Sequence, residues 1–223
     1  MLRTDTRGTG DPVVLIHGFT QSGRTWERLA LRLGALHTVI TVDAPGHGGS
    51  AAVAADLAWG AELIGGAGGR AAYVGYSMGG RYALHLALTR PDLVTRLVLI
   101  STTAGIDDPG QRADRRRADD LLAERVECDG VEAFVAWWLS RPLFATLGLQ
   151  DAALDTRLAN TAAGLASSLR RAGAGTTEPL WARLGELSMP VLVVAGELDA
   201  AYLAHARRLA DGIGDNATLL AVG

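Results

Sequence analysis

Five consecutive residues carry the strongest chemical signal in this chain. Gly75-Tyr76-Ser77-Met78-Gly79 follows the apolar run 71–74 and precedes a helix-like stretch. A strand, a Gly-x-Ser-x-Gly turn and a helix together form a nucleophile elbow, whose turn is so sharp that the residues beside the serine need almost no side chain. The Ser77 hydroxyl then stands at a helix N-terminus, where developing negative charge is favoured. This pattern predicts a reactive Ser77, and the alternative is a turn serine that caps a helix.

The loop after the first apolar run is the candidate second half of the site. His17-Gly18-Phe19 follows residues 13–16, and in an elbow enzyme one N–H of this loop pairs with the N–H after the nucleophile to bind an oxyanion. Here those amides belong to Phe19 and Met78, and losing one such donor typically costs about 3 kcal/mol of transition-state stabilisation. We expect the His17 side chain to shape the loop through backbone hydrogen bonds.

A carboxylate that could orient a catalytic histidine follows the apolar run 191–195. Asp199 comes after the serine in the chain, as an elbow enzyme requires. There it would hold the histidine in the right tautomer and stabilise its charged form. Glu197 is a rival for this role, and the alternative for either acid is the N-cap of a helix over residues 202–209.

The histidine of such a triad should follow the last strand, and none is found there. That strand, residues 217–222, runs almost to Gly223. His47 in a loop and His85 on a helix are explained more simply as structural. We therefore expect the C-terminal end to be truncated ahead of the histidine, and the alternative is a serine that works without a base. The five histidines are His17, His37, His47, His85 and His205.

Arginines are the second chemical signal. Arg81 lies one helical turn after Ser77 on the same side, where an unused charge should cost stability. Arg115 belongs to the arginine-rich run 112–117. Because arginine binds carboxylates in bidentate fashion, these residues suit a polyanionic substrate. For most of the run, however, we expect a solvated face paired with nearby acids, whereas this interpretation is weaker for Arg81. The acids are Asp114, Asp119 and Asp120.

These groups must be positioned by short apolar strands, each followed by a glycine- or aspartate-bearing turn and a helix-like segment. Such strands alternating with helices predict a mostly parallel sheet with helices on both faces, in the α/β class. Together with the elbow, this is the α/β-hydrolase fold. The expected strands are residues 13–16, 39–42, 72–74, 97–100, 191–195 and 217–222.

A long helix-like stretch interrupts this rhythm after the fourth recognisable strand. It has no clear strand, and an insertion there would lie over the carboxyl ends of the strands, where ligands bind in open α/β sheets. We therefore divide the chain into a first core part (1–103), a helical lid (104–187) and a last core part (188–223). Its aromatic residues are expected to form the lid core, with one or two of them walling the pocket. They are Trp137, Trp138, Phe144 and Trp181.

The charge and composition of the chain indicate which kinds of partner it can bind. The chain of 223 residues has a net charge of -3, which offers no footprint for nucleic acid or an anionic membrane. No apolar run could span a bilayer, no signal peptide is evident, and a single cysteine, Cys128, suits a reducing compartment. We expect a cytoplasmic protein with a small-molecule substrate. Neither metal-ligand spacing nor a dinucleotide fingerprint is present, so no metal and no cofactor is predicted.

The combined pattern resembles the 2-succinyl-6-hydroxy-2,4-cyclohexadiene-1-carboxylate synthases of menaquinone biosynthesis over nearly the whole chain. The elbow and the first two loops are generic to the superfamily. The run from Ser77 to Arg81 and the arginine-rich segment select this branch. The matching segments are His17-Gly18-Phe19 with Gly23-Arg24-Thr25-Trp26, Asp43-Ala44-Pro45-Gly46-His47-Gly48-Gly49-Ser50, Gly75 to Arg81, Gly105-Ile106 with residues 112–119, and Trp138 ahead of Pro142-Leu143-Phe144.

This resemblance implies a lyase that eliminates pyruvate from 2-succinyl-5-enolpyruvyl-6-hydroxy-3-cyclohexene-1-carboxylate, a tricarboxylate. Ser77, activated by histidine and acid, would act as the base on a ring carbon acid. The Phe19 and Met78 amides would stabilise the developing negative charge, and Arg81 and Arg115 would bind carboxylates. The residues that match further pocket positions of the family are Tyr76 and Trp138.

Two departures leave other functions open. The family tends to carry a lysine shortly after the acid, where Ala200-Ala201 stand here, and the histidine is absent. One alternative is a carboxylesterase or a carbon–carbon bond hydrolase, because one fold hosts many chemistries. The other is a non-catalytic ligand-binding protein that kept the pocket.

Overall fold

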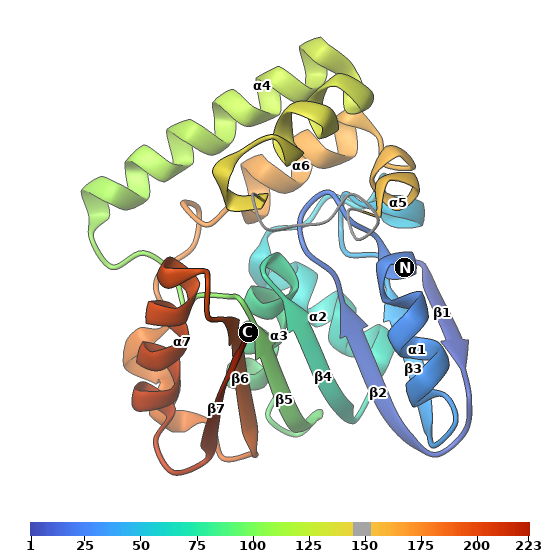
Figure 1. Ribbon diagram of the computed structural model, residues 1–223, viewed down its shortest axis with the longest axis vertical. Helices are drawn as coiled ribbons and strands as arrows, with labels where there is room; N and C mark the ends of the chain where they lie inside the picture. Colours follow the sequence, from blue (N-terminus) through green and yellow to red (C-terminus); the bar gives the residue numbers. More distant parts are fainter. Residues whose placement is uncertain (145–152) are drawn as a thin grey trace.

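A seven-stranded sheet forms the centre of the molecule. The computed structural model describes residues 1–144 and 153–223, and its strands lie in the order β1-β3-β2-β4-β5-β6-β7 (Figure 1). Only β1 is antiparallel to its neighbour, so the predicted mostly parallel sheet is confirmed. The sequence pattern missed β1 because its residues are polar. The strands are β1 (Thr4–Arg7), β2 (Asp11–Ile16), β3 (His37–Val42), β4 (Ala71–Tyr76), β5 (Val94–Ile100), β6 (Val191–Gly196) and β7 (Ala217–Val222).

Helices lie on both faces of the sheet, as predicted. Parallel strands are joined by right-handed crossovers. The β2–β3 connection runs toward the β1 edge of the sheet, whereas the later connections run toward the β7 edge. The helix α1 therefore lies on the face opposite α2, α3 and α7. Leu15 packs beneath α1, whereas Ile16 faces the larger core. On the α1 face, the described elements leave β7 uncovered, and Leu220 there is 48% exposed. These helices are α1 (Glu27–Leu33), α2 (Leu57–Gly68), α3 (Met78–Thr89) and α7 (Ala200–Ile213).

The connections after β2 and β4 run toward opposite edges of the sheet, which makes the boundary between these two strands a topological switch point. These two strands are neighbours, with Ile16 opposite Gly75, and their following segments turn toward opposite faces. Ligands bind at such switch points in open α/β sheets. The loop after β2 and the elbow after β4 therefore lie side by side. Their approach is so close that a Cβ on Gly79 would lie 2.3 Å from the Ile16 carbonyl oxygen.

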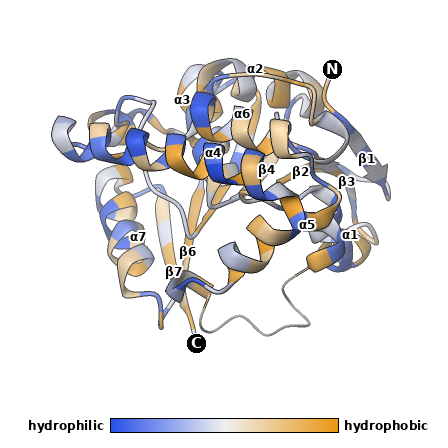
Figure 2. Cartoon of the chain, turned by 90° about the horizontal axis from the view of Figure 1, so that it is seen from above, coloured by the Kyte–Doolittle hydropathy of each residue, from blue (hydrophilic) through white to orange (hydrophobic). Residues whose placement is uncertain are grey.

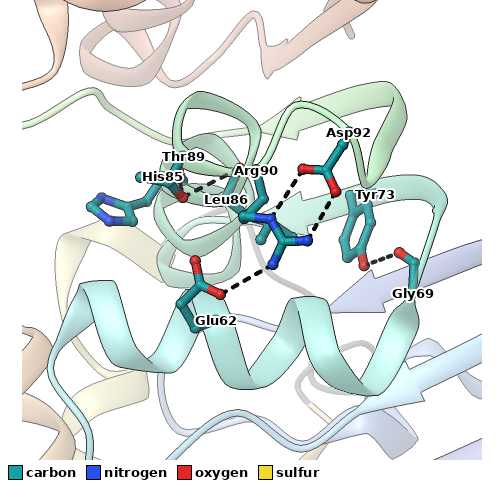
Figure 3. Close-up of polar contacts among 8 residues, drawn as sticks. All are labelled: Glu62, Gly69, Tyr73, His85, Leu86, Thr89, Arg90 and Asp92. Carbon is teal, nitrogen blue, oxygen red and sulfur yellow. Dashed lines mark hydrogen bonds and ion pairs between the residues drawn. The ribbon is translucent and has the colours of Figure 1, made fainter.

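Polar contacts fix the helices behind the elbow. Arg90, which ends α3, forms a two-bond ion pair with Asp92 and reaches Glu62 of α2 at 3.5 Å (Figure 3). The Tyr73 hydroxyl of β4 donates to the Gly69 carbonyl oxygen at 2.6 Å, just past the end of α2. These contacts hold α2, α3 and β4 as one unit.

Helices α4, α5 and α6, which come between β5 and β6 in the chain, stand above the carboxyl ends of the strands (Figures 1 and 2). Within the described residues this insert contains no strand, as predicted, and α4 and α6 pack around the buried Phe134 and Leu165. Trp181 was expected in this lid core but packs against the main core instead. The division of the chain at residues 104 and 187 stays a prediction. The insert comprises α4 (Pro109–Leu139), η3 (Pro142–Phe144), α5 (Leu154–Leu158), α6 (Ala162–Ala172) and η5 (Trp181–Glu186).

The tight contact at Gly79 predicts opposite effects for two Gly→Ala substitutions. Gly79→Ala should lower the free energy of unfolding by about 1–3 kcal/mol, because backbone must move to admit the Cβ. Gly66→Ala should raise it by about 0.5–1 kcal/mol, because a Cβ at this exposed α2 position meets nothing within 4 Å. Urea unfolding of both variants measures this. Equal effects would contradict the close approach of α3 to β2.

Candidate active site

Ser77 has the strained backbone of a nucleophile elbow. Its φ of 52° and ψ of -111° are rare for a residue with a side chain, and such conformations cost about 1–3 kcal/mol. The surrounding structure fixes it from both sides. The Ser77 N–H donates to the Ile100 carbonyl oxygen at 2.9 Å, and the Thr102 hydroxyl donates to the Ser77 carbonyl oxygen at 2.7 Å. The strand, turn and helix predicted around Ser77 are therefore present.

The Gly18–Phe19 peptide is held in one orientation. Its carbonyl oxygen, on Gly18, accepts from His17 Nδ1 at 2.8 Å and from the Gln21 N–H at 3.1 Å. A trans peptide points its N–H opposite its carbonyl, so the Phe19 N–H is aimed away from these partners. Met78 is the first residue of α3, where an amide has no acceptor within the helix. In the described parts of the chain, neither amide has a hydrogen-bond acceptor.

A cavity of about 720 Å³ lies over Ser77, between the sheet and the insert. Phe19, Ser77 and Met78 line it from the core side, and α4 and α6 line it from the other side. Trp138 forms part of its wall, and its indole Nε1 is buried without a partner among the described residues. The cavity therefore has two backbone N–H groups without acceptors beside the serine and an unpartnered indole N–H within its wall.

Four arginines line this cavity and make it strongly positive. Arg81 is half-buried, its Nη1 is buried without a partner in the described structure, and burial lowers its pKa. Arg115 Nε donates to Asp119 Oδ1 at 2.9 Å, and Asp119 is fully buried. The remaining two cavity arginines are Arg125 and Arg141.

Two predicted site residues lie beside the cavity rather than in its wall. Tyr76 packs beneath Gly18, where a Cβ would be 2.9 Å from the Tyr76 ring. Burial raises the pKa of Tyr76, and the negative charge of Asp199 nearby raises it further. Asp199 itself is the N-cap of α7, accepting from the Tyr202 N–H at 3.1 Å, as its alternative interpretation predicted. Glu197 is exposed. A catalytic role for Asp199 and substrate contact by Tyr76 stay predictions.

His17 and His47, the two histidines near the elbow, use both of their ring nitrogens in hydrogen bonds to backbone groups. His17 Nδ1 faces the Gly18 carbonyl oxygen, so it carries the proton and Nε2 accepts from the Ala44 N–H at 3.0 Å. His47 Nδ1 likewise faces the Pro45 carbonyl oxygen, and Nε2 accepts from the Thr20 N–H at 3.3 Å. Neither ring has a nitrogen left for Ser77, so the structural interpretation of both is correct.

The other three histidines also lie away from Ser77. His205, on α7, stacks against Trp181 of η5. His85 lies half-buried on α3, near the contacts between α3 and α2 (Figure 3). His37 begins β3, at the opposite end of the sheet from the elbow. None of the five histidines lines the cavity. Within residues 1–223, Ser77 therefore has no histidine as its base.

Sequence reasoning missed several polar residues of the insert. Asp119 was expected on a solvated face, yet it is buried beside Arg115. Five of the cavity-lining residues of α4, at positions 115, 118, 119, 122 and 125, have helical spacing, which could have revealed this face. Arg157 and Asn160, buried where α5 meets α6, gave no signal of this kind because they act across loops.

The sequence is similar to known proteins along most of its length. The model of the alpha/beta hydrolase family matches residues 13–222. A Bacillus subtilis (strain 168) protein, provisionally named 2-succinyl-6-hydroxy-2,4-cyclohexadiene-1-carboxylate synthase, is 37% identical over 212 residues, which cover 87% of this chain and 76% of that protein. The Escherichia coli O1:K1 enzyme of the same name is 29% identical over 209 residues, which cover 89% of this chain and 81% of that protein.

Solved structures agree with this similarity. MenH from S. aureus superposes with a TM-score of 0.91 at 30% identity, covering 100% of this chain and 90% of that chain. A thermophilic esterase from Thermogutta terrifontis with malate bound superposes with a TM-score of 0.84 at 26% identity, and the match covers 99% of this chain and 84% of that chain.

The two buried histidines predict that stability falls in mild acid. Burial lowers the pKa of His17 from 6.5 to about 4 and that of His47 to about 3. Between pH 6.5 and these values the unfolded chain binds protons that the folded chain does not. Their contribution is complete above pH 6.5 and is lost as the pH falls, by about 2 kcal/mol per histidine at about pH 5.

Urea unfolding at about pH 7.5 and pH 5 measures this loss. His47→Gln should reduce the difference in unfolding free energy between the two pH values by about half, and His37→Gln should leave it unchanged. Equal wild-type stability at both pH values would contradict the neutral state of the two rings.

Proposed function

The chain belongs to the alpha/beta hydrolase family and to its branch of 2-succinyl-6-hydroxy-2,4-cyclohexadiene-1-carboxylate synthases, and we propose that Ser77 is the base with which it eliminates pyruvate. The substrate is 2-succinyl-5-enolpyruvyl-6-hydroxy-3-cyclohexene-1-carboxylate. The observation that carries this proposal is an arginine-lined cavity over the elbow, together with a lining arginine, Arg81, whose Nη1 is buried without a partner in the described structure. A carboxylate there would neutralise a charge that is otherwise costly to bury.

The names of substrate and product define the bonds that change. Once the Ser77 hydroxyl has passed its own proton to a base such as free imidazole, its oxygen removes the ring proton at C2, beside the succinyl carbonyl. The freed electron pair forms the C2–C3 double bond, the C3–C4 double bond moves to C4–C5, and the C5–oxygen bond breaks. The leaving group is the enolate of pyruvate, which takes up a proton. No water is consumed, so the reaction is an elimination.

The backbone donors suit the charge that this step creates. As the C2 proton leaves, negative charge develops on the succinyl carbonyl oxygen, and the Phe19 and Met78 amides can bind it. Preorganised donors of this kind are often the largest catalytic contribution. Arg81 and Arg115 bind two of the three carboxylates. The Trp138 indole N–H, buried without a partner among the described residues, is a third neutral donor toward the ligand.

Asp199 is the proposed acid of the triad. Its carboxylate is close enough to affect the pKa values of Tyr76 and His205. One of its oxygens caps α7 and fixes its position at the carboxyl end of β6. Because the five histidines of residues 1–223 lie elsewhere, assays should be run with and without free imidazole, which can supply the missing base.

An esterase is the second candidate, supported by the superposition with the malate-bound Thermogutta enzyme. The same elbow and oxyanion donors would then serve a covalent acyl-enzyme. The two functions differ in their products, because ester hydrolysis releases an alcohol and consumes water. A ligand-binding protein without activity would bind the tricarboxylate and release nothing.

The reaction is proposed to take place in the cytoplasm. Among the described residues, no helix is both long enough and apolar enough to cross a membrane. The only cysteine, Cys128, is exposed and unpaired, which suits a reducing compartment. The proposed partner is the small polycarboxylate substrate alone.

Ser77→Ala should abolish most of the pyruvate release. A positioned base typically contributes about 10²–10⁴-fold, so a loss of that size is expected when pyruvate is measured by coupling to lactate dehydrogenase. Ser168→Ala is the matched control, because Ser168 also lines the cavity but only contacts Met78 Sδ at 3.7 Å. Equal activity of the two variants would contradict the role of Ser77.

Arg81→Met should weaken function while stabilising the fold. Replacing a buried unpaired charge with an apolar side chain should raise the free energy of unfolding by about 1 kcal/mol. Removal of its bond to a substrate carboxylate should lower kcat/KM about 10²-fold. Arg117→Met, on the exposed side of α4, should change neither quantity. Unchanged kcat/KM in Arg81→Met would contradict carboxylate binding by Arg81.

A further inference from the structure

Asn160 makes three hydrogen bonds from a buried position between α5 and α6. Its Nδ2 donates to the Thr20 carbonyl oxygen at 2.6 Å and to the Arg157 carbonyl oxygen at 2.9 Å. Its Oδ1 accepts from the Gly48 N–H at 2.8 Å. All of its amide groups are therefore used, and two of the three partners belong to core loops.

Thr20 is the residue that Asn160 holds, and it needs to be held. Its φ of 66° lies in the left-handed region, where a β-branched residue is strained. Three side chains fix it: His47 accepts from its N–H, Arg157 donates to its hydroxyl, and Asn160 donates to its carbonyl oxygen. Two of these three come from the insert.

Thr20 directly follows Phe19, whose N–H is the proposed oxyanion donor. Arg157 also reaches the Phe19 carbonyl oxygen at 3.4 Å. The Phe19 ring packs edge-on against Trp138 at 5.5 Å between centroids. The loop that presents the Phe19 amide is thus fixed by its own core contacts on one side and by the insert on the other.

We infer that Asn160 is a positioning residue for the oxyanion hole, holding Thr20 and so orienting the Phe19 amide. This inference rests on the proposed function of that amide. Asn160 also ties the loop to Gly48, whose neighbour His47 supports the Thr20 N–H. It therefore bridges the two core loops that meet beneath the cavity without touching the ligand, because it does not line the cavity.

Two substitutions at Asn160 and one elsewhere test this. Asn160→Ala removes all three bonds, whereas Asn160→Asp keeps an acceptor for Gly48 but places a carboxylate against the Thr20 carbonyl. Thr156→Val is the control, because it removes a different bond between insert and core, from Thr156 Oγ1 to Thr25 Oγ1 at 3.1 Å. It also removes a local bond to the Ala153 carbonyl oxygen, and neither bond involves the loop that carries Phe19. Thermal unfolding shows that each variant is folded.

Both Asn160 variants should lower kcat for pyruvate release about 10- to 100-fold, with KM changed less than about threefold. The equilibrium Kd for propane-1,2,3-tricarboxylate should stay within about twofold, because the arginines are unaffected. Thr156→Val should keep the wild-type kcat. A rise in KM with unchanged kcat, or an equal loss in Thr156→Val, would overturn the inference.

A second probe does not need the pyruvate reaction. Phenylboronic acid accepts an electron pair from the Ser77 oxygen, whose proton passes to solvent, and the resulting anionic boronate places an oxygen in the oxyanion hole. Its affinity, measured by quenching of tryptophan fluorescence, should fall about tenfold or more in both Asn160 variants and stay unchanged in Thr156→Val. Unchanged affinity in the Asn160 variants overturns the inference even if the protein releases no pyruvate.

Discussion

The backbone bend at Ser77 is the constraint on which the rest of the structure depends. A residue with φ of 52° is strained, and it persists because hydrogen bonds from β5 and Thr102 hold both of its peptide groups. The bend is possible only because Gly75 and Gly79 lack side chains, which lets α3 approach β2 closely. That approach places the Met78 amide and the loop of Phe19 beside the same hydroxyl. The bend at Ser77 therefore determines both how α3 packs on the sheet and where the groups of the site lie.

Charge determines which chemistry this geometry can serve. The cavity walls hold four arginines and one buried aspartate, so positive charge outnumbers negative charge there, as the proposed polycarboxylate substrate requires. Burial lowers the pKa of Arg81, because water solvates its charged form poorly at this position. An enzyme that only hydrolysed neutral esters would gain nothing from this arrangement. In the proposed function, a bound substrate carboxylate offsets the cost of burying the Arg81 charge.

The sequence predicted the parts of the molecule that depend on local patterns. The apolar runs located six of the seven strands, and the glycines around Ser77 located the elbow. The polar strand β1 was missed because it is stabilised by pairing with β3 rather than by burial. Asp119 was misplaced because its burial depends on α6 packing against α4. Asn160 could not have been found from sequence, since two of its three partners, Gly48 and Thr20, lie more than a hundred residues away.

The central claim is that the Ser77 oxygen removes a ring proton and thereby expels pyruvate. It is tested most directly by single-turnover pyruvate release from the tricarboxylate carrying hydrogen or deuterium at C2, in the presence of imidazole. The account predicts that pyruvate forms from both, more slowly from the deuterated substrate, while mass spectrometry finds Ser77 unmodified. An acyl adduct on Ser77, or no pyruvate from either substrate, would contradict it.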